Sequence, residues 1–194
     1  MRMMIGTAPA LALALAACGS NTPASDVDMA NEAVVNEMVN DTALPEALPP
    51  ATAMTGQAFA NTAAASDAFE IETSKLAVEK ARSDAVKQFA QKMIDAHTTS
   101  TARLKTAAAA ASPAITPDAA LPVDLKGKLD ALKTASAATF DADYVREQVA
   151  AHENTLAAVR AYADNGDVDP LKRFAADMVR PVSEHLDMAR ALKP

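Results

Sequence analysis

The chain has 194 residues and a formal net charge of −7, and alanine is the most frequent of the hydrophobic residues that make up half of it. Aromatic residues make up 4%, tryptophan is absent and there are only 5 glycines. This composition favours long helices over sheets, because alanine is the best helix former while β-branched and aromatic residues favour strands. The acidic balance excludes nucleic acid as a partner, since phosphate binding needs clustered Lys and Arg.

The N-terminus has the pattern of a secretion signal over residues 1–17. Arg2 supplies a positive charge, and the apolar run APALALALAA follows it. This run is too short to cross a hydrocarbon layer of roughly 30 Å as a helix. The sequence LAAC that ends at Cys18, the only cysteine, resembles the lipobox of bacterial lipoproteins, in which the cysteine is acylated. We therefore expect a lipid anchor on Cys18, with the membrane as partner.

Residues 18–56 are expected to form a disordered tether. They contain six acidic residues and four prolines but no Lys or Arg, and such a segment buries too little apolar surface to order itself. A flexible coil of this length reaches roughly 35 Å. Gly19 rather than an aspartate follows the cysteine, which by resemblance to common lipoprotein sorting rules indicates the periplasmic face of the outer membrane.

Residues 57–194 are expected to form a helical bundle. Apolar residues recur at spacings of three and four, the pattern of a bundle seam. The Pro-containing stretch SPAITPDAALP interrupts the pattern, and Ser83 and Asp169-Pro170 are start signals. The predicted helices cover 57–81, 84–110, 122–138 and 142–164, and a fifth begins at Asp169.

The chain also repeats itself. KLAVEKARSDAVKQFAQKM (75–93) resembles TLAAVRAYADNGDVDPLKRFAADM (155–178), so each half holds a similar helical hairpin. Two hairpins joined by a long crossover are the layout of a ferritin-like bundle. The predicted fold is therefore all-α, an up-and-down ferritin-like four-helix bundle with an extra crossover helix.

All three histidines lie on the predicted seams. His97, His152 and His185 belong to the second, fourth and fifth helices, and the repeat aligns His152 with Glu72 on the first. Each long helix thus supplies one group that can bind a metal, and we expect these four to converge in the interior. Two interpretations remain open: a site for iron, copper or zinc, or a buried polar network that fixes helix register.

Several neighbours are secondary candidates for this site. Met93 and Met188 share helix faces with His97 and His185, and thioether with imidazole suits Cu(I), although methionine more often fills core gaps. The carboxylates nearest the seam are Glu70, Glu153 and Glu184.

Two kinds of chemistry find no support in the sequence. A di-iron bundle wants Glu three residues before its histidines, but Ile94, Val149 and Val182 stand there. The chain has no Gly-x-Ser-x-Gly and no Gly-rich phosphate loop, so no nucleophilic machinery is predicted and an enzyme is not the favoured interpretation.

Residues 59–191 resemble the DUF4142 family of bacterial ferritin-like envelope proteins. The matching motifs are FEIE on the first helix, His97-Thr98 on the second, Phe140-Asp141 with Tyr144, Gln148 and His152 on the fourth, and Pro181 with His185-Leu186 on the fifth. Ala96 stands where the family usually has Asp, which weakens a metal site that depends on that carboxylate. The family has no assigned activity, so the resemblance implies fold and location rather than function. The favoured hypothesis is a non-catalytic binding or structural lipoprotein of the periplasm, with a degenerate metal-binding bundle as the alternative. The sequence identifies no cofactor and no protein partner.

Overall fold

The computed structural model describes residues 54–193, which form five helices and no strand. The all-α fold class is confirmed. The expected signal peptide, Cys18 and nearly all of the expected tether lie outside the described residues. The helices are α1 (Gly56–Lys80), α2 (Asp84–Ala109), α3 (Val123–Thr134), α4 (Phe140–Asn165) and α5 (Asp169–Ala191).

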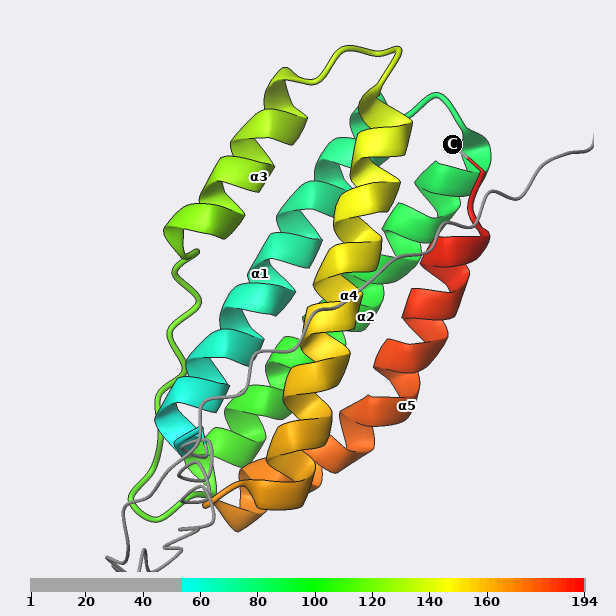
Figure 1. The fold of residues 1–194 in the computed structure, drawn as a ribbon. Coiled ribbons are helices and arrows are strands. Elements are labelled where there is room, and N and C mark those ends of the chain that lie inside the picture. Colours follow the sequence, from blue (N-terminus) through cyan, green and yellow to red (C-terminus); the bar gives the residue numbers. More distant parts are fainter. Residues whose placement is uncertain (1–53, 194) are drawn as a thin grey trace, which may run out of the picture. The chain divides into compact units, whose positions relative to one another are not determined.

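The four long helices form two antiparallel hairpins that pack side by side. α1 packs most closely against α2, and α4 against α5. The hairpins meet where α1 faces α4 and α2 faces α5 (Figure 1). The chain between α2 and α4 runs back along the bundle before α4 begins, so α2 and α4 point in the same direction (Figure 1). This long crossover is the feature that distinguishes a ferritin-like bundle from one with short loops throughout.

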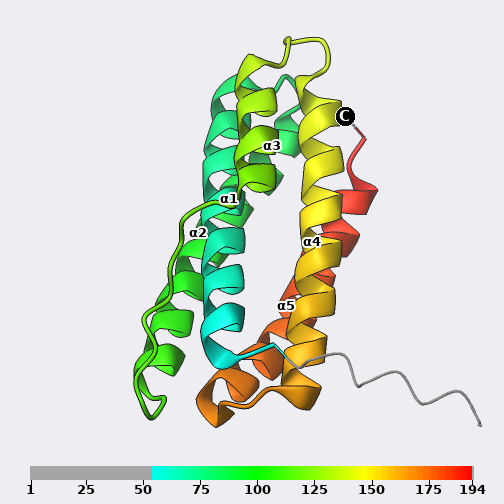
Figure 2. The ribbon, with the colours of Figure 1, turned by 60° about the vertical axis from the view of Figure 1, so that its left-hand side comes forward.

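The short helix α3 belongs to this crossover and covers one side of the bundle. It packs on α1 and α4 (Figure 2). Leu129 and Leu132 are its buried residues, and Lys80 near the end of α1 donates hydrogen bonds to the backbone carbonyls at the end of α3, including 2.7 Å to Lys133. α1 is therefore covered on two sides, by its bundle neighbours and by α3.

The helix boundaries differ from expectation by a few residues at the turns. α4 starts at Phe140, two residues before its predicted start. Asp141 in its first turn accepts backbone hydrogen bonds from Arg82 and Ser83 at 2.8–3.2 Å and so ties α4 to the turn between α1 and α2. Ser83 precedes α2 but its side chain makes no capping bond. Asp169 is the first residue of α5 rather than its cap. None of the helices in 54–193 is long and apolar enough to cross a membrane.

The core consists of two apolar clusters with a polar layer between them. One cluster centres on Phe59, Leu104 and Leu171, and the other on Met93, Phe140 and Tyr144. The buried polar residues fall mostly between them and come from α1, α2 and α4; they are Asp67, Glu70, Thr73, Ser74, His97, Ser100, Gln148 and His152. Burying so many polar groups is costly unless they are bonded, so this layer is the natural place to look for function.

Candidate metal centre

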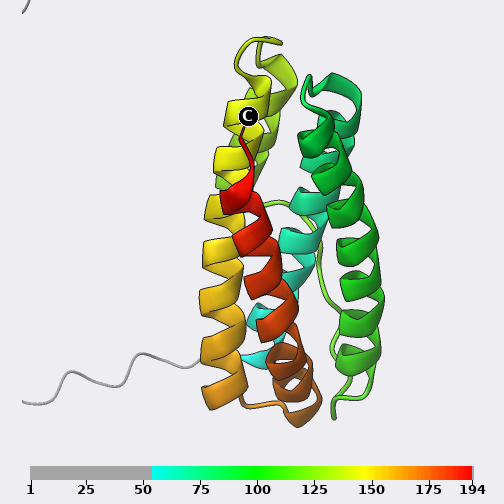
Figure 3. The ribbon, with the colours of Figure 1, turned by 90° about the vertical axis from the view of Figure 1, so that its right-hand side faces the viewer.

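The three histidines meet in the polar layer, each from a different helix. The ring centroids of His97, His152 and His185 are 5.6–5.8 Å apart, and their ligand-capable nitrogens lie within 4.8 Å of one another. His97 and His152 are buried, while His185 is partly exposed and lines a space between α2 and α5. These two helices lie side by side (Figure 3). The predicted convergence of the histidines is therefore present in the structure.

Two of the imidazoles are held in place by an oxygen atom at Nδ1, the ring nitrogen that points away from the other histidines. His97 Nδ1 is 2.8 Å from Asp67 Oδ1, and Thr101 donates a hydrogen bond to the other oxygen of this carboxylate at 3.1 Å. His152 Nδ1 is 2.8 Å from the backbone oxygen of Gln148. In a neutral ring, an oxygen at Nδ1 fixes the proton on that nitrogen and leaves the lone pair on Nε2. Metal-binding histidines almost always have such a carboxylate or carbonyl partner.

The nitrogens on the other side of the rings have no partner. His97 Nε2, His152 Nε2 and His185 Nδ1 are buried and make no hydrogen bond with any described residue. A buried polar atom without a partner costs about 1–3 kcal/mol, and native proteins rarely leave several in one place. Three such atoms close together make this the strongest candidate site for a bound polar group or ion in the described part of the chain.

Two of the three imidazoles are held in the neutral form. Burial, and to a smaller extent the nearby His97, lower the pKa of His152 to about 3 and that of His185 to about 4. Burial acts in the same direction on His97, but the hydrogen bond with Asp67 and the charge of Glu70 outweigh it and raise the pKa of His97. Neutral imidazole is the form that binds metal, so His152 and His185 are ready for an ion at neutral pH.

The arrangement fits one metal ion with small adjustments. An ion bound to three imidazoles at 2.0–2.1 Å holds their nitrogens about 3.4 Å apart in tetrahedral geometry. The ligand atoms here lie within 4.8 Å of one another, so the three imidazoles must move closer together when an ion binds. Three histidines and one open position are a known ligand set for zinc.

The glutamate that α1 places in the interior is not the one predicted from the sequence. Glu72 lies on the surface, half exposed, and pairs with Lys75 at 2.8 Å, so its predicted place in the interior is wrong. Glu70 is buried instead, with Oε1 at 3.8 Å from His152 Nδ1. Residues two apart on a helix point about 200° away from each other, so only one glutamate of this pair can face inward.

Glu70 and His152 are close, but they do not form an ion pair. Burial raises the pKa of Glu70 to about 7 and lowers that of His152 to about 3, so both groups are neutral between these values. Both oxygens of Glu70 lack a hydrogen-bond partner among the described residues. Glu70 lies on the Nδ1 side of His152, behind the ring rather than among the converging nitrogens.

The other secondary candidates do not join the cluster. Glu153 and Glu184 are exposed and pair with Arg190 and Arg180, each at 2.7 Å. Met93 is fully buried in an apolar cluster against which Met188 packs, and the Met188 sulfur lies 3.6 Å from Lys92 Nζ.

Of the two residues that hold the histidines, Asp67 was not singled out in the sequence, and Gln148 was named only as part of a family motif. Asp67 lies three residues before Glu70 on the inward face of α1, and Gln148 lies four residues before His152. Helical spacing from the buried glutamate is the signal that would have found Asp67, once the inward face of α1 was known.

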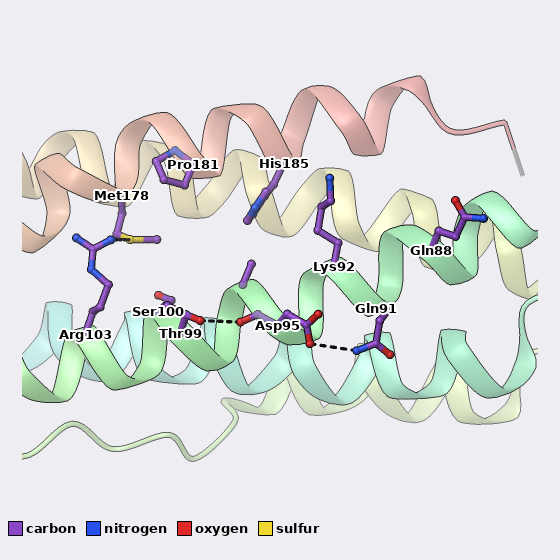
Figure 4. A pocket seen from close by; sticks show the side chains of 11 residues that line it. Gln88, Gln91, Lys92, Asp95, Thr99, Ser100, Arg103, Met178, Pro181 and His185 are labelled. Carbon is purple, nitrogen blue, oxygen red and sulfur yellow. Dashed lines mark hydrogen bonds between the residues drawn. The ribbon is translucent and has the colours of Figure 1, made fainter.

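A small chamber adjoins the cluster, and a larger groove lies outside it. The chamber has a volume of about 20 Å³ and is lined by Asp67, His97 and His185 among others. The groove runs between α2 and α5 with a volume of about 700 Å³, and His185 lies in its wall together with Lys92 and Arg103 (Figure 4). His185 lines both spaces.

These features define a helical-bundle protein with a buried three-histidine cluster. A family model described as "Domain of unknown function (DUF4142)" matches residues 41–192, and the chain belongs to this family. The match begins before the predicted domain start at residue 57. Neither a curated protein nor a solved structure matches the chain.

Proposed function

We propose that the bundle of residues 54–193 binds a single metal ion through His97, His152 and His185. The observation that carries this proposal is the meeting of three buried imidazole nitrogens that have no partner among the described residues. Asp67 and the Gln148 carbonyl already occupy the Nδ1 atoms of two of the rings. In a polar network without an ion, the remaining nitrogens would face one another and have no hydrogen-bond partner among the described residues.

The ligand set favours zinc or copper over iron. Imidazole is a borderline ligand that suits Zn²⁺ and Cu²⁺, whereas non-haem iron sites usually include a carboxylate ligand. Asp67 hydrogen-bonds His97, and Glu70 lies behind His152, so neither offers an oxygen at the point where the three nitrogens meet. We infer a mononuclear site whose ion stabilises the junction of the two hairpins.

We further propose that this metal-binding module is carried on a bacterial envelope lipoprotein, anchored through Cys18 at the periplasmic face of the outer membrane. The lipobox-like LAAC and the acidic stretch after it support this placement. In a bacterial host, radiolabelled palmitate should enter the full chain, and Cys18→Ser should abolish the label. Label that persists in the variant would contradict the anchor without touching the metal site.

The metal proposal is tested by thermal unfolding of the purified bundle, freed of metal by a chelator and then given Zn²⁺, Cu²⁺ or Fe²⁺ separately. An ion at 100 times its Kd adds about 2.7 kcal/mol, which for a protein of this size raises Tm by on the order of 5–10 °C. Zinc or copper should give this rise at one ion per chain. His185→Ala should lose it, because only two imidazoles remain.

A second variant separates binding from simple folding defects. Asp67→Asn keeps all three ligands but weakens the hydrogen bond behind His97, and changes of this kind reduce metal affinity 10–100-fold. Asp164→Asn, at an exposed position of α4, is the matched control and should leave affinity unchanged. If no ion raises Tm of the wild-type bundle, the three histidines form a structural network and the proposal is wrong.

A further inference from the structure

The chamber beside the histidines is separated from the outer groove by very little. Four residues line both spaces: Ala96, Ser100, Met178 and His185. Two of these side chains are small, so the wall is thin where α2 passes the cluster. The chamber, at about 20 Å³, has room for about one water-sized group.

An ion held by three imidazoles has one open position, and the groove is its access. A tetrahedral ion with three protein ligands takes its fourth ligand from solution. His97 and His152 are enclosed, at 4% and 1% exposure, whereas His185 reaches the groove. A ligand from solution therefore approaches past Ala96 and Ser100, on the α2–α5 side.

The groove carries one cation that is not paired. Lys92 and His185 enter the space between α2 and α5 from opposite sides (Figure 4). Within the described part of the chain no carboxylate lies within salt-bridge distance of Lys92 Nζ, whose polar neighbour is the Met188 sulfur.

Of the other charged groups of the groove, one is in a salt bridge. Arg103 pairs with Asp177 at 2.7 Å. The Asp95 carboxylate accepts a hydrogen bond from the neutral Gln91 amide at 3.1 Å and keeps its negative charge. Lys92 is thus the cation available to an anionic ligand, and Asp95 is the carboxylate that such a ligand has to avoid.

From this geometry we propose that the metal centre takes a small inorganic anion as its exchangeable ligand. One donor atom of the anion occupies the chamber and binds the ion in place of water, while the rest of the anion lies in the groove near Lys92. Chamber size limits the ligand to a few atoms, and the Lys92 ammonium favours negative charge over a neutral ligand of equal size. This inference rests on the proposed metal site.

The test uses the bundle loaded with one Cu²⁺ per chain and titrated with azide as the probe. Binding of azide to the copper should produce a new ligand-to-metal absorption band that saturates. Lys92→Gln should weaken azide binding roughly 3–10-fold with copper affinity unchanged. Lys105→Gln, exposed on the same helix outside the groove, is the matched control and should have no effect.

A second variant tests whether the ligand reaches the ion from the groove through the wall of the chamber. Ala96→Leu places a larger side chain in the wall shared by groove and chamber, and should abolish or strongly slow azide binding while copper still binds. Ala85→Leu, at an exposed position of α2 outside the groove, should bind azide as the wild type does.

The outcomes separate the two proposals. Copper binding without an azide band, or azide binding that neither Lys92→Gln nor Ala96→Leu changes, would overturn the anion site and leave the metal site standing. Failure to bind copper, zinc or iron at all would overturn both.

Discussion

Glu70→Gln should stabilise the metal-free protein by about 3 kcal/mol at pH 8, and by almost nothing at pH 4.5. Burial raises the pKa of Glu70 from 4.5 to about 7, so between these values the folded state keeps a proton that the unfolded state has lost. Stability therefore falls as pH rises through this window, by about 1.4 kcal/mol per pH unit, and stays low above it. Glutamine has a similar shape and never ionises, so the variant escapes this loss.

The measurement is urea unfolding at pH 4.5, 6 and 8 with a chelator present. Glu72→Gln is the matched control, because Glu72 lies two residues further on the same helix, half exposed and paired with Lys75. A surface pair of this kind contributes about 0–1 kcal/mol, so the control should follow the wild type at every pH. If Glu70→Gln and wild type lose stability in parallel as pH rises, Glu70 is not buried as the structure places it.

The second large effect concerns His152 and has the opposite pH dependence. Burial lowers the pKa of His152 from 6.5 to about 3, so below pH 6.5 the unfolded state binds a proton that the folded state rejects. Stability is lost as pH falls through this range, and at pH 4.5 the loss from His152 is about 3 kcal/mol. His152→Leu should remove it, stabilising the metal-free protein at pH 4.5 while changing it little at pH 7.5.

The same urea series measures this prediction. Asn154→Leu, exposed on α4 two residues away, controls for the general effect of a leucine on this helix and should keep the wild-type pH dependence. Should His152→Leu lose stability toward acid as steeply as the wild type, the imidazole is not held neutral. Together the two groups place the stability maximum of the wild-type bundle between about pH 4.5 and 6.5.

The architecture was predictable because it depends on long-range periodicity. The 3-and-4 spacing of apolar residues and the internal repeat indicated four long helices in two hairpins, and the histidines were placed on inward faces by the same argument. His97 and His152 interrupt clean apolar stripes on α2 and α4, so their direction was unambiguous. Helix ends were less certain, since Asp141 bonds across to the α1–α2 turn rather than capping its own helix.

The inward face of α1 could not be read from spacing alone. This helix has two buried stripes: Asp67, Glu70 and Ser74 face the bundle interior, whereas Ala65 and Phe69 line a cavity shared with α3 and α4. The repeat alignment with His152 selected Glu72, and the more apolar stripe, beside α3, did not indicate the face that carries Glu70. When a crossover helix packs on a bundle helix, that bundle helix acquires a second buried stripe. If this stripe is the more hydrophobic one, the sequence does not reveal which face carries the functional residues.

The division of the histidines between the two hairpins has a consequence for how the protein holds together. His97 comes from α2, whereas His152 and His185 come from α4 and α5, so neither hairpin possesses the cluster by itself. In the metal-bound state the ion acts as a cross-link between two halves that the backbone joins through a single long connection. If a protease cut that connection, the halves would come apart more readily without the ion than with it. The proposed ion would thus act as a removable cross-link, and the concentration of metal around the protein would set how strongly the two hairpins are held together.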